Sequence, residues 1–158
     1  MAAVVTAAFG IASPAAAADD NSVYRAYVSR DADFVKLGKH VRRGMRIWYR
    51  SGWKRSKPAL RALARTVKAC DELIPAIDAQ QPSSDHGARG TSAAIASVRF
   101  LGKSAATAGK GVRAGTAGHR ARAKRLLARA DRQLRQAGAE EKVARREFKA
   151  AGVQIKPG

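Results

Sequence analysis

The sequence predicts an all-α protein, a small antiparallel helical bundle or two helical hairpins with about four helices, and three observations support this. Apolar residues recur at intervals of three and four in four separate segments, which is the spacing of one helical face. No useful length of the chain alternates between apolar and polar residues as a half-buried strand would. Short connections separate the segments, so we expect consecutive helices to lie antiparallel.

Residues 1–18 precede the helical segments and predict a secretory signal peptide. They carry no Asp, Glu, Lys or Arg, and an apolar run is followed by Pro14 and by Ala16-x-Ala18. This pattern is typical of secretory signals, so we expect cleavage before Asp19. No Lys or Arg precedes the run, so its positive charge would come from the free amino terminus or from an upstream start. The alternatives are an uncleaved anchor, for which the run is short, and a disordered alanine-rich leader.

The helical domain is expected over residues 19–151, and its first half predicts two amphipathic helices. A short helical piece comes first, with Tyr24, Tyr27 and Val28 on one face. Residues 31–50 follow as a basic amphipathic helix, in which Gly38 would let a neighbour approach closely. The apolar stripe of this helix consists of Phe34, Leu37, Val41, Met45 and Trp48.

The connections and the second long helix follow from Gly, Pro and Ser. Gly52 suits a left-handed cap at the end of the first long helix. Ser56 is a candidate N-cap for the next, in which Pro75 is expected to cause a kink or an early end. Pro, Ser and Gly in residues 80–90 predict a loop. The apolar face of this helix consists of Leu60, Leu63, Ala64, Val67, Cys70, Ile74 and Ile77.

The second half of the chain predicts two more helices and a flexible segment. Thr91 or Ser92 would cap a third helix. The glycines of residues 102–118 have two interpretations, a face of small residues for close packing or a flexible basic linker, and we favour a helix to about Ala108 and a loose segment beyond it. A fourth helix begins at His119 and is expected to break at Gly138. Residues 152–158 are expected to be a disordered tail.

The charge is the most informative feature of the composition. The net charge is +19, from 31 Lys and Arg against 12 Asp and Glu. Between Asp33 and Asp71 there are 12 basic residues and no acidic one, and between Asp85 and Asp131 there are 10 and again none. Long stretches of one sign hold polyanions. Val, Ile, Leu and Phe make up less than a fifth of the residues after Ala18, so we expect a marginal core.

The first acid-free stretch supplies the candidate anion-binding residues. Aromatic side chains among cations can stack on bases or sugars, or lie at a membrane interface. Trp53 lies in a turn and is a candidate contact, whereas Trp48 belongs to the apolar stripe and is a better core residue. The predicted anion-binding residues are Lys36, Lys39, Arg42, Arg43, Arg46, Arg50, Trp53, Lys54, Arg55, Arg61, Arg65 and Lys68.

The motifs of catalysis and metal binding are incomplete, so we expect a protein that is not an enzyme and has no cofactor. Gly102-Lys103-Ser104 resembles the end of a P-loop, but Ser97 stands where that motif needs glycine. The three histidines are far apart in the chain, and no His or Cys pair has metal-ligand spacing. Cys70 falls on an apolar stripe and is expected to be a buried small residue.

Three functions fit these observations. The leading hypothesis is an exported bacterial binding protein that holds an anionic cell-envelope polymer or an anionic lipid surface by electrostatics. The second is an intracellular, cytoplasmic protein that binds nucleic acid without sequence preference, which would apply if the leader is not a signal. The third is a secreted structural or toxin-like adhesion protein. No small-molecule substrate is evident, and no integral membrane segment is expected in the mature chain.

Overall fold

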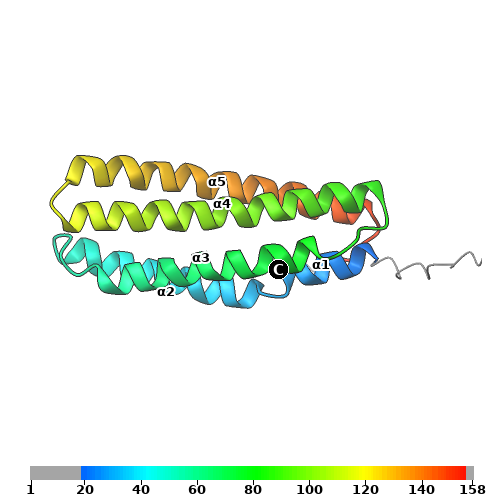
Figure 1. Cartoon of the computed structure of the whole chain (residues 1–158), viewed down its shortest axis with the longest axis horizontal. Helices are drawn as coiled ribbons and strands as arrows, with labels where there is room; N and C mark the ends of the chain where they lie inside the picture. The colour runs from blue at the N-terminus through cyan, green and yellow to red at the C-terminus, as the bar shows by residue number, and fades with distance from the viewer. Residues whose placement is uncertain (1–18, 156–158) are drawn as a thin grey trace, which may run out of the picture.

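The computed structural model describes residues 19–155 and confirms the prediction of an all-α helical bundle. The helices are α1 (Asp20–Val28), α2 (Asp31–Arg50), α3 (Lys57–Asp78), α4 (Asp85–Thr116) and α5 (Arg120–Ala150). Four long helices run along one axis as two antiparallel hairpins, α2–α3 and α4–α5, and the short α1 lies at one end (Figure 1). The predicted signal peptide, residues 1–18, lies outside the described residues.

The α4–α5 hairpin is held together by small residues at intervals of seven on both helices. The hydroxyl of Ser97 donates a hydrogen bond to the carbonyl oxygen of Ala137 at 3.0 Å, and that of Ser104 to the carbonyl oxygen of Ala130 at 2.8 Å. Side chains this small let the two backbones approach closely along the whole hairpin. The positions are Gly90, Ser97, Ser104 and Gly111 on α4, and Ala123, Ala130, Ala137 and Ala144 on α5.

Three glycines of residues 102–118, namely Gly102, Gly111 and Gly115, serve close packing, and the flexible segment favoured from the sequence is wrong. Helix α4 continues to Thr116. A Cβ atom at Gly111 would lie 3.1 Å from Cγ of Leu127, and one at Gly115 would lie 2.5 Å from the ring of Trp48. The close packing of Leu127 and Trp48 against these glycines offsets the low helix propensity of glycine. The expected break at Gly138 is also wrong, because α5 runs through it to Ala150.

The predicted loop at residues 80–90 is shorter in the structure, because α4 begins at Asp85. Its N-cap is Ser84, not Thr91 or Ser92, and the Ser84 hydroxyl oxygen accepts a hydrogen bond from the Gly87 backbone N–H at 2.9 Å. The Asp20 carboxylate accepts hydrogen bonds from the Ser84 hydroxyl at 2.6 Å and from the Ser83 backbone N–H at 2.9 Å. A carboxylate 63 residues away in the chain thus completes the cap.

Three further expectations are corrected. Helix α3 continues past Pro75 to Asp78, so of the two predicted effects of this proline, a kink or an early end, the early end is wrong. Nothing lies within 4 Å of a Cβ atom built on Gly38, so the close approach of α2 occurs instead at Gly44, against Ala59 of α3. The start of the predicted tail is packed: the Val153 side chain is 4% exposed, and Gly152 provides the left-handed turn before it.

The apolar core consists of two clusters toward opposite ends of the bundle. The larger one joins α1 to the start of α4 and the end of α5, and it includes Tyr24 against Phe148 with ring centroids 5.5 Å apart. The other surrounds the fully buried Trp48 near the α2–α3 turn. Between them, the predicted α2 stripe is only half-buried, at Phe34, Leu37, Val41 and Met45.

Candidate anion-binding face

The α2–α3 hairpin brings basic residues from two helices onto one surface. Gly44 permits this, because a Cβ atom there would lie only 2.7 Å from the Ala59 backbone. The two helices therefore touch backbone to backbone at this point, and the long side chains beside the contact extend into solvent. Cations of α2 and of α3 therefore lie side by side on one surface.

Two adjoining hollows mark this surface. The first, of about 360 Å³, is lined by Arg43 and Ile47 of α2 and by Arg61 and Arg65 of α3, with His40 at its side. The second, of about 490 Å³, shares Ile47 and lies at the α2–α3 turn. Neither lining contains an acidic residue. We define the basic face as the Lys and Arg residues that line these hollows, namely Arg43, Arg50, Lys54, Arg55, Arg61 and Arg65.

The cations of the basic face keep their charge available. Within residues 19–155, none of the six forms an ion pair with an acidic side chain. Six positive charges over one surface with no neutralising partner create a field that attracts anions, and ions in solution screen it. The half-buried Ile47 between the hollows adds an apolar contact on an otherwise charged surface.

The other predicted anion-binding residues lie elsewhere. Lys36, Lys39 and Arg46 are exposed on α2 but line neither hollow. The Lys68 ammonium lies 3.7 Å from the Glu72 carboxylate, which also binds Arg30 at 2.6 Å. Arg42 lies on the opposite flank of α2, beside the helices of the other hairpin. Six of the eleven predicted cations thus gather on the basic face.

Trp53 is half-buried at the end of the bundle. Its ring centroid lies 4.9 Å from that of Trp48, and the Arg120 guanidinium lies 5.8 Å from the ring. The backbone of Trp53 has a positive φ of 72°, which is rare for a residue with a side chain. A hydrogen bond from the Trp48 indole N–H to the Trp53 carbonyl oxygen, at 2.9 Å, holds this turn. Trp53 thus fixes the turn that carries Lys54 and Arg55.

His40 is a residue of this surface that the sequence analysis did not select. It lies on α2 one turn before Gly44, the residue of closest approach to α3. The available signal was its spacing of three from Arg43. A histidine beside arginines adds positive charge to the surface only when it is protonated.

A second polar cluster ties the start of α4 to the end of α5. The Glu147 carboxylate binds His86 Nδ1 at 2.9 Å, Arg89 Nε at 3.1 Å and Arg146 at 3.1 Å. Hydrogen bonds from His86, Arg89 and Arg146 lower the pKa of Glu147 to about 2. One carboxylate thus joins side chains of α4 and α5, and the cluster fastens the two helices.

The described residues offer little for nucleophilic or metal chemistry. Burial, and next the charge of Asp71, raises the pKa of the Cys70 thiol to about 12, so the reactive thiolate is disfavoured. Within residues 19–155, no group of three or more His, Cys, Asp or Glu side chains is placed to hold a metal ion.

Comparison with protein-family models, curated proteins and solved structures finds no match to this chain. Among the described helices, none is both long enough and apolar enough to span a membrane.

Proposed function

We propose that this protein is an exported, non-enzymatic binding protein that holds an anionic cell-envelope polymer on its basic face. The observation that carries the proposal is the pair of adjoining hollows lined by six unpaired Lys and Arg residues and by no acidic residue. Several cations spread over one surface can contact successive phosphate or carboxylate groups of a polymer. Such contacts are numerous, individually weak and sensitive to salt.

The shape of the basic face favours a polymer over a small anion. A small anion is usually held by convergent donors in an enclosed pocket. Here the cations are exposed and are spread over α2, the turn and α3. The open face lets a chain run along the hairpin and contact the two hollows in succession, with Ile47 between them.

The proposed location follows from the leader and from the start of the folded domain. The Asp19 side chain accepts a hydrogen bond from the Ser22 backbone N–H at 2.7 Å and so caps α1. Cleavage before Asp19 would therefore leave the first helix and its cap complete. The intact mass of the native protein in separated culture fractions tests this: a species that starts at Asp19 in the medium or envelope supports export, and a full-length cytosolic species contradicts it.

The binding test uses charge reversal with a matched control. The triple variant Arg43→Glu, Arg61→Glu, Arg65→Glu alters the basic face, and Arg122→Glu, Arg125→Glu, Arg129→Glu makes the same charge change on exposed residues of α5. Affinity for inorganic polyphosphate is measured in a salt titration, with circular dichroism to verify helicity. We expect the first variant to lose at least about 100-fold in affinity, because the three lost cations each contribute about 1 kcal/mol and the three new carboxylates repel an anionic partner.

The control decides between a defined face and a general effect of charge. Much smaller loss in the α5 variant supports the basic face as the site. Equal loss in both variants would contradict it and leave only the net charge as the cause. Parallel titrations with duplex DNA and anionic vesicles compare the partner classes, and strong preference for DNA together with a cytosolic full-length chain would replace the proposal with nucleic-acid binding.

A further inference from the structure

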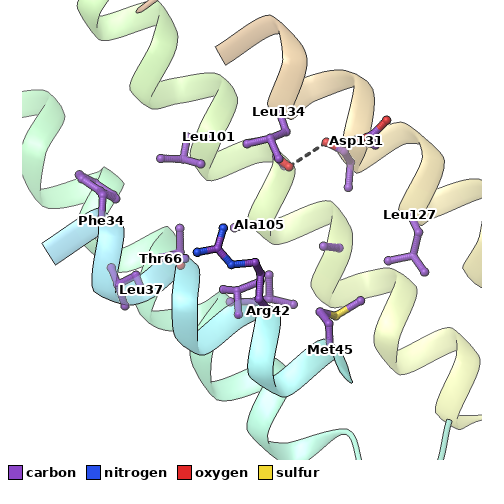
Figure 2. Close-up of a pocket in the computed structure, with 16 residues that line it drawn as sticks. Phe34, Leu37, Arg42, Met45, Thr66, Leu101, Ala105, Leu127, Asp131 and Leu134 are labelled. Carbon is purple, nitrogen blue, oxygen red and sulfur yellow. Dashed lines mark hydrogen bonds between the residues drawn. The ribbon is translucent and has the colours of Figure 1, made fainter. Parts of the chain in front are cut away.

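A second concave surface, apolar in character, lies between the two hairpins on the side away from the basic face. It has a volume of about 500 Å³, within the range of roughly 300–1,000 Å³ of small-molecule sites. Helix α2 forms one wall and α5 forms the other, and α4 and α3 lie between them, with Thr66 of α3 in the lining (Figure 2). We call it the interhelical groove. A further hollow of about 600 Å³ continues it toward α1 and shares Phe34, Gly38, Arg42 and Leu101 with it.

The groove is open because α2 packs against α3 and makes little contact with α4 or α5. Phe34, Leu37, Val41 and Met45 of α2 are only half-buried there, and Leu134 of α5 is 49% exposed. Gly38 lines both hollows with nothing within 4 Å of a Cβ atom built on it. Apolar side chains that face one another across open space would be covered by an apolar ligand at a gain of about 25 cal/mol per Å² of area removed from water.

Arg42 supplies the polar feature of the groove. Figure 2 shows its side chain extending from α2 into the space between the walls. The acidic groups of the lining are already paired: Asp131 binds Arg135 at 2.6 Å, and Glu141 binds Arg145 at 3.0 Å. Asp31 lies 3.9 Å from the same Arg145.

Among the charged residues of these linings, Arg42 is the one without an ion pair in residues 19–155. A guanidinium on an apolar wall matches a carboxylate, with which it forms paired hydrogen bonds.

We infer that the interhelical groove binds one fatty acid, with the hydrocarbon chain along α2 and the carboxylate at Arg42. From Arg42 the apolar positions of α2 run back to Phe34, which is eight residues or about 12 Å of helix at 1.5 Å per residue. The adjoining hollow continues from there to Tyr27 and Leu73. An acyl chain with its carboxylate at Arg42 therefore has an apolar wall along its length, and the charge of Arg42 selects an anionic head over a neutral one.

The fatty acid fits this space better than a further helix does. An α-helix with its side chains is about 10–12 Å across, wider than a groove of this volume accepts over its length. This site is separate from the basic face, because Arg42 lines neither of the two basic hollows.

The test measures the binding of dodecanoate to the full chain by titration calorimetry, with dodecanol as the neutral counterpart. Gly38→Leu places a side chain in the groove at a position with open space, so helicity and melting temperature are expected to stay level or rise while dodecanoate affinity falls at least tenfold. Arg42→Gln is expected to weaken dodecanoate about tenfold or more and to leave dodecanol unchanged. Arg46→Gln, on the same helix but outside the groove, is the matched control.

Several results would overturn the inference. Unchanged dodecanoate affinity in Gly38→Leu would place the ligand elsewhere, and equal loss in Arg42→Gln and Arg46→Gln would show that only general charge matters. Sedimentation that shows a dimer dissociated by Gly38→Leu would make a second copy the occupant. Tight dodecanoate binding only after removal of residues 1–18 would make the leader the occupant. Polyphosphate binding and dodecanoate binding are tested with different variants, so either proposal can fail without the other.

Discussion

The approach of α2 to α3 can be tested with the same substitution at two glycines of one helix. A Cβ atom at Gly44 would lie 2.7 Å from the Ala59 Cα and N atoms and 2.9 Å from the Pro58 carbonyl carbon. All three are backbone atoms, so a side-chain rotation cannot relieve the contact. Since carbon atoms pack at about 3.5–4.0 Å, Gly44→Ala must push the helices apart by about 1 Å. A Cβ atom at Gly38 meets nothing within 4 Å.

Both variants gain the same helix propensity, so the difference between their free energies of unfolding isolates the packing cost at Gly44. Gly38→Ala is expected to raise the free energy of unfolding by about 0.5–1 kcal/mol, because alanine is the better helix former. Overpacking typically costs about 1–3 kcal/mol, so Gly44→Ala is expected to be less stable than Gly38→Ala by about that amount.

The assay is urea unfolding, followed by circular dichroism and by the fluorescence of the buried Trp48. Equal midpoints and equal slopes for the two variants would show that the backbones do not approach at Gly44. The explanation for the convergence of Arg43, Arg61 and Arg65 would then fail. A lower midpoint for Gly44→Ala at an unchanged slope is the expected result.

Three further outcomes are expected. Ala123→Leu should destabilise by about 1–3 kcal/mol in urea unfolding, since Ala123 is fully buried between α4 and α5, whereas Ala128→Leu on the exposed side should change little. Glu147→Gln should lower the melting temperature at pH 7. The pKa of Glu147 falls from 4.5 to about 2 on folding, so the ionised carboxylate stabilises the fold fully above pH 4.5 and loses this effect as the pH falls toward 2. The free energy of unfolding of the variant should therefore decrease less steeply over this pH range than that of the original protein. Cys70 should resist alkylation at pH 8 and react in urea, and fast labelling without urea would contradict its burial.

The sequence carried enough information for the elements of the first half. The spacing of apolar residues gave the bounds of α2 correctly, because a helix with one polar side shows its period directly in the residue types. The glycines of α4 misled the same reasoning, since propensity is a local property. Gly111 lies within a helix because Leu127 packs closely against it, and no local pattern reveals that neighbour.

The heptad spacing of small residues on α4 and α5 was also missed. Alanine is abundant throughout the chain, so an alanine every seven residues does not stand out against its neighbours. The matching positions on α4 are Gly and Ser, and the repeat becomes evident only when Ser104 is seen to donate to the Ala130 carbonyl oxygen. The candidate site shows the same limit of local patterns. The cations from Lys36 to Lys68 were predicted as one set, but the fold places six of the eleven on the basic face and the others elsewhere.

The sequence by itself determined the helical class and the acid-free basic stretches, because the apolar period and the charge are properties of the residues in order. Tertiary structure decided which cations share a surface, that Arg42 lies apart from Arg43, and that a groove remains between the hairpins. The physical reason is that neighbouring residues on a helix point in directions about 100° apart. Which of these directions meets a protein neighbour, and which meets solvent, depends on contacts between segments that are distant in the chain.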